Sequence, residues 1–176
     1  MQEIEAKILD IDRGAIESRL RELGAQLEFD LEFFAIYYDS PDQSLSRSQQ
    51  TLRLRKEGSQ VSLTYKQKTA PESNILSREE IETLVSDFEA TRSILDRLGY
   101  RIRKQMRKTR AQYALGESHI VIDDYLDEHA YIPVFIEIEG PSQEAVEACA
   151  VELGYSKGDL RALTAGDLIH YYQEKA

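Results

Sequence analysis

The sequence predicts an α+β fold in which many antiparallel strands carry one charged face and a few helices lie outside them. Near the start, Glu3, Glu5 and Lys7 alternate with apolar residues, and the same alternation recurs in segment after segment. Because successive side chains of a strand point to opposite faces, each such segment has one charged and one apolar face. Glycine-containing turns between segments indicate hairpins, and capped amphipathic segments indicate helices.

The first predicted elements are a strand over residues 2–10 and a helix that ends at about residue 23. Asp12 is the expected N-cap of this helix, Ile16 and Leu20 share its apolar face, and Gly24 stops it. Aromatic and branched residues then predict a long strand over 27–39, with Tyr37 or Tyr38 near one end of it.

A turn at Ser40-Pro41-Asp42 ends this long strand, and a polar loop over 43–50 follows. Strands over 51–57 and 60–68 are joined at Gly58-Ser59, a hairpin signal. A strand over 74–84 is predicted next, followed by a helix from Ser86 or Asp87 to about Leu98 that Gly99 closes. Strands over 100–115 and 118–127 then form a hairpin around Gly116. The last predicted elements are a strand over 133–139 and helices over about 142–153 and 164–175. About eight evenly spaced strands can close into a barrel, which leaves no unpaired sheet edge.

Composition places the chain among single-domain globular proteins. Its 176 residues, 41% hydrophobic and 31% charged, suit one domain over 1–176, and no apolar run approaches the roughly 20 residues of a membrane span. No signal peptide is visible, so a soluble, cytoplasmic protein is expected. Cys149, the single cysteine, excludes an internal disulfide and cysteine-cluster metal sites.

The charge distribution indicates a small anionic ligand. A net charge of −10 argues against generic binding to nucleic acid or membranes, yet residues 101–110 contain six basic side chains: Arg101, Arg103, Lys104, Arg107, Lys108 and Arg110. Alternation divides this block, with Lys108 and Arg110 on one face and Arg103, Gln105 and Arg107 on the other.

Several predicted strands carry paired charges of one sign on a single face. These are Arg53 and Arg55, Lys66 and Lys68, Glu80 and Glu82 beside Arg78, and Glu137 and Glu139. Ordinary solvated sheet faces explain any one strand but poorly explain repeated pairs. Arginine suits phosphate oxygens, and clustered carboxylates suit a hard cation such as Mg²⁺ or Mn²⁺. The pattern therefore favours a cavity that binds a metal-chelated polyphosphate.

These residues resemble the motifs of the CYTH domain family, the triphosphate tunnel metalloenzymes, which includes class IV adenylate cyclases, thiamine triphosphatases and inorganic tripolyphosphatases. Seven motifs stand in the family's order over about residues 2–140. They are Glu3-x-Glu5-x-Lys7, the Leu-Arg-Leu-Arg of 52–55, the Leu-Thr-x-Lys of 63–66, Arg78-x-Glu80-x-Glu82, Lys108-x-Arg110, Ile122-Asp123 and Glu137-x-Glu139.

The resemblance implies a closed, antiparallel eight-stranded tunnel with flanking helices. Its basic residues would hold a triphosphate: Lys7, Arg53, Arg55, Lys66 and Arg110, with Lys68 and Arg78 as helpers. Its carboxylates would hold one or two ions of Mg²⁺ or Mn²⁺: Glu3, Glu5, Glu80, Glu82, Asp123, Glu137 and Glu139. Lys108 would position or deprotonate an attacking water, because neighbouring arginines disfavour its ammonium form. The alternative role for Lys108 is one more phosphate contact.

The leading functional expectation is a metal-dependent triphosphate hydrolase acting on inorganic triphosphate, thiamine triphosphate or a nucleoside triphosphate. The alternative is a class IV adenylate cyclase that forms cyclic AMP and pyrophosphate. A non-catalytic polyphosphate-binding module is a third reading, and an RNA-binding face over 101–110 is opposed by the net charge. The partner expected is the small-molecule substrate, with no nucleic acid and no membrane, and family analogy suggests a homodimer.

Two departures from the cyclase pattern disfavour cyclisation. The chain begins only two residues before its first motif, without the His-Phe pair of some cyclases, and residues 131–135 read Tyr-Ile-Pro-Val-Phe in place of a Gly-Leu-Gly-Asp-Phe-like segment. In the other direction, the helix after the first strand and the long second strand resemble the cyclase layout. Lys157 and Arg161 match no C-terminal motif of the family well enough to receive a role.

Overall fold

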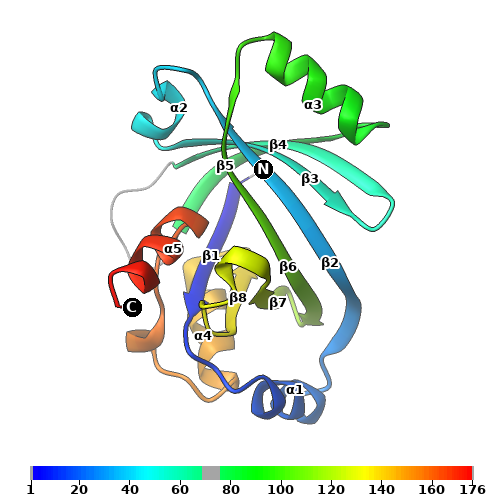
Figure 1. The fold of residues 1–176 in the computed structure, drawn as a ribbon. Coiled ribbons are helices and arrows are strands. Elements are labelled where there is room, and N and C mark those ends of the chain that lie inside the picture. The colour runs from blue at the N-terminus through cyan, green and yellow to red at the C-terminus, as the bar shows by residue number, and fades with distance from the viewer. Residues whose placement is uncertain (1, 69–75, 176) are drawn as a thin grey trace.

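The computed structural model describes residues 2–68 and 76–175 and has an α+β fold, in which eight antiparallel strands curl around a cavity and helices flank them (Figure 1). The strands are β1 (Gln2–Ile8), β2 (Gln26–Asp39), β3 (Gln50–Glu57), β4 (Gln60–Lys68), β5 (Leu76–Leu84), β6 (Arg101–Leu115), β7 (Ser118–Tyr125) and β8 (Phe135–Gly140). The α-helices are α1 (Arg13–Glu22), α2 (Ser44–Arg47), α3 (Phe88–Arg97), α4 (Gln143–Glu152) and α5 (Ala165–Gln173). Two short 3₁₀ helices are η1 (Asp127–His129) and η2 (Lys157–Asp159).

The strands are hydrogen-bonded in the order β1-β5-β4-β3-β2-β6-β7-β8, and every pairing is antiparallel. β1 pairs with β8 from Ile4 to Ile8, and with β5 from Gln2 to Glu5. Beyond that shorter pairing, the backbone of Lys7 exchanges two hydrogen bonds of 2.9 and 2.8 Å with Arg161, from the segment before α5.

Both predicted hairpins are present. Glu57 pairs with Gln60 around Gly58, and Leu115 pairs with Ser118 around Gly116. Gly58 and Gly116 have φ angles of 53° and 59°, a left-handed conformation that glycine adopts without steric cost. The turn residues therefore set the register that the alternating side chains need.

The helix ends follow their capping residues. The carboxylate of Asp12 accepts a hydrogen bond from the Ala15 amide at 2.9 Å and caps α1 as predicted. Asp87, rather than Ser86, caps α3 by accepting from the Ala90 amide at 2.7 Å.

The segment predicted as a polar loop over 43–50 contains the one-turn helix α2. The buried carboxylate of Asp39 organises it, because that carboxylate accepts hydrogen bonds from the amides of Ser40, Leu45 and Ser46 at 2.8, 3.1 and 3.2 Å. A side-chain anchor of this kind leaves no periodic signal in a four-residue helix, so the sequence pattern did not reveal it. The strand predicted over 118–127 is also shorter, since β7 ends at Tyr125 and η1 follows.

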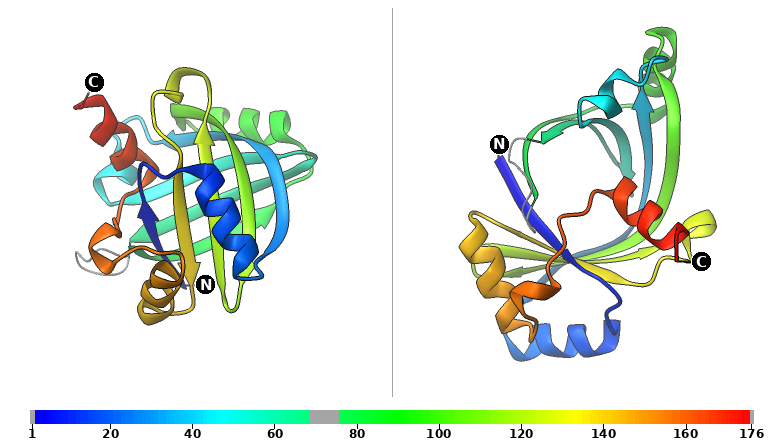
Figure 2. Two further views of the ribbon diagram at one scale, coloured as in Figure 1. Left: turned by 90° about the horizontal axis from the view of Figure 1, so that it is seen from below. Right: turned by 90° about the vertical axis from the view of Figure 1, so that its left-hand side faces the viewer.

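Two of the three apolar clusters of the described residues lie on the outer face of the strands, on the side that helices cover (Figure 2). Ile122 and Ile138 on the outer face of β7 and β8 pack with Leu20 of α1 and Ala150 of α4. At the other end of the molecule, Leu95 of α3 belongs to a second cluster with residues of β2 and β3. The third cluster joins the inward-facing Met106, Tyr125 and Phe135 to Leu168 and Tyr172 of α5, so apolar and charged residues share the inner face of the strands.

A register shift between Tyr37 and Tyr38 interrupts the pairing of β2 with β6. Tyr37 is opposite Lys104 and Tyr38 is opposite Ile102, so Arg103 is the extra residue of a β-bulge. Among the helices that the structure describes, none has the length and apolar character needed to cross a membrane.

Candidate functional site

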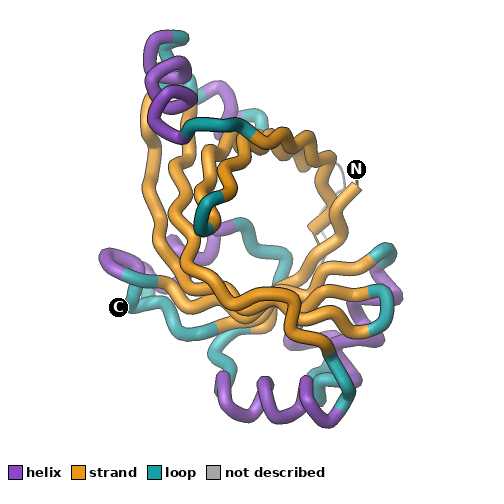
Figure 3. Tube along the Cα trace, turned by 90° about the vertical axis from the view of Figure 1, so that its right-hand side faces the viewer, coloured by secondary structure: helices purple, strands orange, loops and turns teal. Residues whose placement is uncertain are grey.

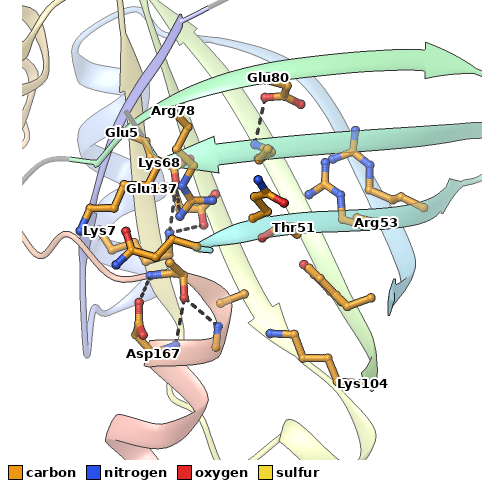
Figure 4. Close-up of a pocket in the computed structure, with 18 of the residues that line it drawn as sticks. Glu5, Lys7, Thr51, Arg53, Lys68, Arg78, Glu80, Lys104, Glu137 and Asp167 are labelled. Carbon is orange, nitrogen blue, oxygen red and sulfur yellow. Dashed lines mark hydrogen bonds and ion pairs between the residues drawn. The ribbon is translucent and has the colours of Figure 1, made fainter. Parts of the chain in front are cut away.

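The strands curl round on themselves (Figure 3), and a cavity of about 770 Å³ lies inside them (Figure 4). Side chains from all eight strands line it, and one end is formed by the α2 segment together with the start of α5. Figure 4 shows Glu5, Arg78 and Glu137 in one group on one side of this space, with Arg53 and Lys104 on the other. Its walls are therefore mostly charged, and both signs are present.

The inward face of β3 carries two crowded guanidinium groups. Arg53 and Arg55 have side chains only 14% and 17% exposed, and the Nε atom of each is buried without a hydrogen-bond acceptor in the described residues. Burial, together with the charge on Arg53, lowers the pKa of Arg55 to about 10, so that it is still protonated at neutral pH. Buried donors without acceptors are costly, and an anionic ligand would satisfy them.

β4 and β5 add three cations on the same face. The Lys66 ammonium pairs with Glu80 at 3.0 Å, and Lys68 also lines the cavity. Arg78 lies 3.5 Å from Glu5, and its Nη2 atom makes no hydrogen bond within the described part of the chain. Two neighbouring strands thus present pairs of cations to one space and β5 adds Arg78, as the alternation predicted.

A group of three carboxylates lies where β1 meets β8. One oxygen from each of Glu5, Glu137 and Glu139 lies within 4.8 Å of the other two. Three carboxylate oxygens at this spacing match the all-oxygen ligand sets that Mg²⁺ and Mn²⁺ prefer. The donor set therefore fits a hard divalent cation at this place.

The carboxylates of β5 make contacts with cations and hydroxyls instead. Glu82 accepts a hydrogen bond from the Thr64 hydroxyl at 2.7 Å and lies 3.6 Å from Arg55. Partial burial opposes ionisation of Glu82, but the hydrogen bond and the nearby guanidinium outweigh it and lower its pKa. Glu82 is therefore ionised at neutral pH.

Beneath the cavity, Asp123 organises a buried ion-pair network. Its side chain is 0% exposed and accepts hydrogen bonds from Arg110 Nε and Nη2 at 2.8 and 2.7 Å. Arg110 Nη2 also donates to Glu137 at 2.6 Å, and Glu137 pairs with the Lys7 ammonium at 2.8 Å. Burial opposes ionisation of Glu137, but the charges of Lys7 and Arg110 hold its pKa well below the usual range.

Lys108 is the remaining member of this network. Its ammonium donates a hydrogen bond to Asp123 and lies 5.6 Å from the centre of the Tyr125 ring. Burial and the neighbouring charge of Arg110 lower the pKa of Lys108, in the direction that the sequence suggested. A lysine with a lowered pKa can exchange a proton near neutral pH more readily than a surface lysine.

Comparison with known proteins identifies the family of this chain. A model of the CYTH domain matches residues 1–171. The chain belongs to the CYTH domain family. It is 31% identical over 128 residues, 70% of each chain, to a protein of Methanocaldococcus jannaschii named a putative adenylate cyclase.

Solved structures share the same fold at lower identity. A protein of Vibrio parahaemolyticus described as a putative adenylate cyclase superposes with a TM-score of 0.80 at 20% identity, over 96% of this chain and 97% of its own. A Hippeastrum protein described as a putative adenylyl cyclase with a dominant triphosphatase activity has a TM-score of 0.70 at 16% identity, over 96% and 95%. At these identities the likeness concerns the fold.

Most of the predicted site residues of this CYTH domain meet in the cavity. The lining includes Glu5, Lys7, Arg53, Arg55, Lys66, Lys68, Arg78, Glu80, Glu82, Lys108, Arg110, Glu137 and Glu139. Asp123 lies behind this lining, with both carboxylate oxygens hydrogen-bonded to Arg110 and Lys108. The side chain of Glu3 lies outside the described residues, so its predicted role in metal binding stays a prediction.

Sequence reasoning gave no site role to several lining residues of the CYTH domain, Lys104 and Tyr37 among them, and it placed Arg103 on the wrong face. Lys104 lies on the same face of the strand as Lys108 and Arg110, because every second side chain points the same way. Extending the alternation from Lys108 through Met106 would therefore have identified Lys104 as a lining residue. Tyr37 was expected only near a tunnel mouth. In the structure Tyr37 is partly buried; burial raises its pKa, but the charges of Arg53 and Lys104 outweigh this and lower it to about 8. Arg103 was predicted on the outer face, but the bulge turns it to the cavity, where its guanidinium donates to the Ser46 hydroxyl.

Proposed function

We propose that this CYTH domain is a divalent-metal-dependent triphosphate hydrolase. The observation that supports this most directly is the combination, in one cavity, of buried guanidinium donors without acceptors and a group of three carboxylates. Arg53 and Arg55 would bind phosphoryl oxygens, and Glu5, Glu137 and Glu139 would bind Mg²⁺ or Mn²⁺. The cation would neutralise charge on the phosphoryl oxygens when bound.

The proposed reaction is attack of water on the terminal phosphorus. The bond from that phosphorus to its bridging oxygen breaks, which gives orthophosphate and a diphosphate product. Arg53, Arg55 and Arg78 would hold the substrate and stabilise the charge that develops on its oxygens. Lys108 would either accept the proton of the attacking water, which its lowered pKa favours, or contact a phosphoryl oxygen.

We further propose that the strands form a closed tunnel around the substrate. The pairing of β1 with both β5 and β8 supports closure, as does the backbone bridge between Lys7 and Arg161. A closed ring of strands would exclude bulk water and strengthen each electrostatic contact inside. Action in the cytoplasm and a homodimeric state remain predictions.

Phosphorus NMR of the purified protein tests this function. Tripolyphosphate, thiamine triphosphate and ATP would each be incubated with Mg²⁺ and with Mn²⁺, and orthophosphate plus a diphosphate product is the expected result. Arg55→Met should raise KM by roughly tenfold or more, because a charged hydrogen bond worth about 1.5–3 kcal/mol is lost. Lys56→Met is the matched control, since the neighbouring Lys56 is exposed on the outer face. No turnover of any triphosphate would contradict the proposal.

Adenylate cyclase activity is the second candidate, because the Methanocaldococcus relative is named for it. In that reaction the ribose 3′-hydroxyl attacks the α-phosphorus of ATP and pyrophosphate leaves. The same spectra decide between the two, since cyclic AMP with pyrophosphate would establish cyclisation, and orthophosphate with ADP would establish hydrolysis.

A further inference from the structure

The helix α3 buries only part of its apolar surface against the strands. It lies at one extremity of the molecule (Figure 1). Leu95 is 5% exposed and packs in one cluster with Leu54 of β3, whereas Ile94 and Leu98 are 57% and 70% exposed. Residues four apart lie on the same side of a helix, so Ile94 and Leu98 form one apolar stripe. The strands leave that stripe largely uncovered.

The exposed stripe lies on the flank of α3 that faces away from β2. Burial raises the pKa of Tyr38, on the outer face of β2, and the nearby charge of Asp96 raises it further, so Asp96 lies on the β2 side of α3. Two residues of an α-helix turn through about 200°, so Ile94 projects from the opposite flank. Since the strand order is β2-β3-β4-β5, that flank lies toward β4 and β5.

The outer face of β4 and β5 continues this exposed apolar surface. Tyr65 of β4 pairs with Leu52 of β3 on one side and with Ile81 of β5 on the other. Leu52 and Tyr65 are half-buried, but Ile81 is 60% exposed, so the cover that α3 gives to β3 does not extend to β5. Isolated exposed apolar residues are ordinary, but a group of them on neighbouring elements marks an interaction site. We call Tyr65, Ile81, Ile94 and Leu98 the α3–β5 surface.

The stripe on α3 is complementary to a second copy of itself. Ala90, Ile94 and Leu98 follow one another at four-residue spacing and form one ridge of the helix. If two copies of α3 pack antiparallel about a two-fold axis at Ile94, the small Ala90 of each copy meets the large Leu98 of the other. Packing of such four-residue ridges against each other is the commonest helix contact in globular proteins.

Charge also favours a second copy in this orientation. Asp87 and Glu89 lie at the N-terminal end of α3, and Arg97 lies in its last turn. An antiparallel pair brings each basic end to an acidic end, whereas a parallel pair would place like charges together. The net charge of −10 opposes the other apolar occupant, a lipid surface.

The size of the contact indicates that the strands take part in it. A ten-residue helix is about 15 Å long and roughly 10 Å wide, too small to bury the roughly 800 Å² per partner of a standard interface. The outer face of β4 and β5 lies beside α3 and supplies further area.

We propose that the α3–β5 surface is the interface of a homodimer in which the two α3 helices pack antiparallel about a two-fold axis near Ile94. The proposal gives a definite interface to the homodimer that the family resemblance suggests. It does not depend on the proposed hydrolase activity, because the surface lies on the outer face of the strands.

Sedimentation velocity of the full chain tests the interface. We expect the wild type to be mostly dimeric at about 100 µM, and Ile94→Asp to weaken the association at least about tenfold. Val151→Asp is the matched control, because Val151 is a β-branched residue of α4 that is 58% exposed, as Ile94 is 57% exposed. Its association should equal that of the wild type. If circular dichroism shows that Ile94→Asp is unfolded, Leu98→Ser replaces it in the same comparison.

Cysteine cross-linking tests the position of the two-fold axis. In Ile94→Cys, the two introduced thiols face each other at the axis, so oxidised glutathione should link the copies by a disulfide. Val151→Cys should not form this dimer, and the native Cys149 is buried in both variants.

Four outcomes would overturn the proposal. A wild type that is monomeric at about 100 µM would exclude the dimer. A dimer that persists in Ile94→Asp, or that Val151→Asp weakens equally, would place the interface elsewhere. A dimer that Ile94→Asp dissociates, but that Ile94→Cys does not cross-link, would exclude the two-fold axis at Ile94. A monomer that sediments with phosphatidylcholine–phosphatidylserine vesicles, and loses this with Ile94→Asp, would assign the surface to a lipid.

Discussion

Replacement of Asp123 by asparagine should destabilise the protein severely, because Asp123 is the buried acceptor of the network under the cavity. The change removes a fully buried negative charge that accepts two hydrogen bonds from Arg110 and one from Lys108. Breaking a buried ion pair from one side typically costs about 3–5 kcal/mol. Arg110 keeps Glu137 at 2.6 Å as a second carboxylate, so we expect the lower end of that range, about 3 kcal/mol.

Thermal unfolding followed by circular dichroism measures this loss. For a chain of 176 residues, about 3 kcal/mol corresponds to a fall in Tm of roughly 6–12 °C. Asp124→Asn is the matched control, since Asp124 is the next residue of β7 and its side chain makes no hydrogen bond to the described residues of the network. The stability of this control should change by less than about 0.5 kcal/mol.

A double variant identifies the origin of the loss. Lys108→Met removes one of the two cations that Asp123→Asn leaves with fewer acceptors. The double variant should therefore be less destabilised than the sum of the single variants. Equal stability of Asp123→Asn and Asp124→Asn, or strict additivity with Lys108→Met, would refute the reasoning that this network is a coupled unit.

Three further predictions concern metal binding, acid stability and a tyrosine. Glu139→Gln should weaken Mn²⁺ binding at least about tenfold by calorimetry, whereas Glu117→Gln, at an exposed hairpin turn, should not; equal affinities would contradict the carboxylate site. Because the pKa of Glu137 is held well below 4.5 in the folded state, its stabilising effect is present above pH 4.5 and is lost as the pH falls through the folded-state pKa. Urea unfolding of the wild type should therefore lose more stability between pH 5 and pH 3 than that of Glu137→Gln, and parallel losses would exclude this role. Ultraviolet titration should show one tyrosine ionising near pH 8, and Tyr37→Phe should abolish that step; its persistence would assign it to another of the ten tyrosines.

The residues on the inward faces could be predicted because side chains alternate between the two faces of a strand. Once the apolar residues are assigned to one face, the remaining residues must lie on the other. Leu54 is fully buried under α3, and that fixes Arg53 and Arg55 on the opposite face. The same logic places Glu137 opposite Ile136 and Ile138. Both inferences need only the sequence and the pleat of the strand.

The rest depended on contacts between segments that are far apart in the chain. The family resemblance, and not alternation, singled out Asp123, and neither shows that Arg110 and Lys108 donate hydrogen bonds to its oxygens. Arg103 was misplaced because a β-bulge adds one residue to β6, and nothing in the local pattern marks it. The start of α5 reaches the cavity through the bridge between Arg161 and Lys7, a pairing across more than 150 residues that periodicity cannot reveal.

The placement of the core outside the strands has a consequence for how this chain can vary in length. Neighbouring residues of one strand have separate tasks, since one packs under the helices and the next faces the cavity. A single inserted or deleted residue within β3 would exchange the two sets, burying arginines under α3 and pointing leucines into the cavity. Changes in length should therefore be tolerated only at turns such as Gly58-Ser59, whereas changes of inward side chains can alter ligand preference and leave the outer packing in place.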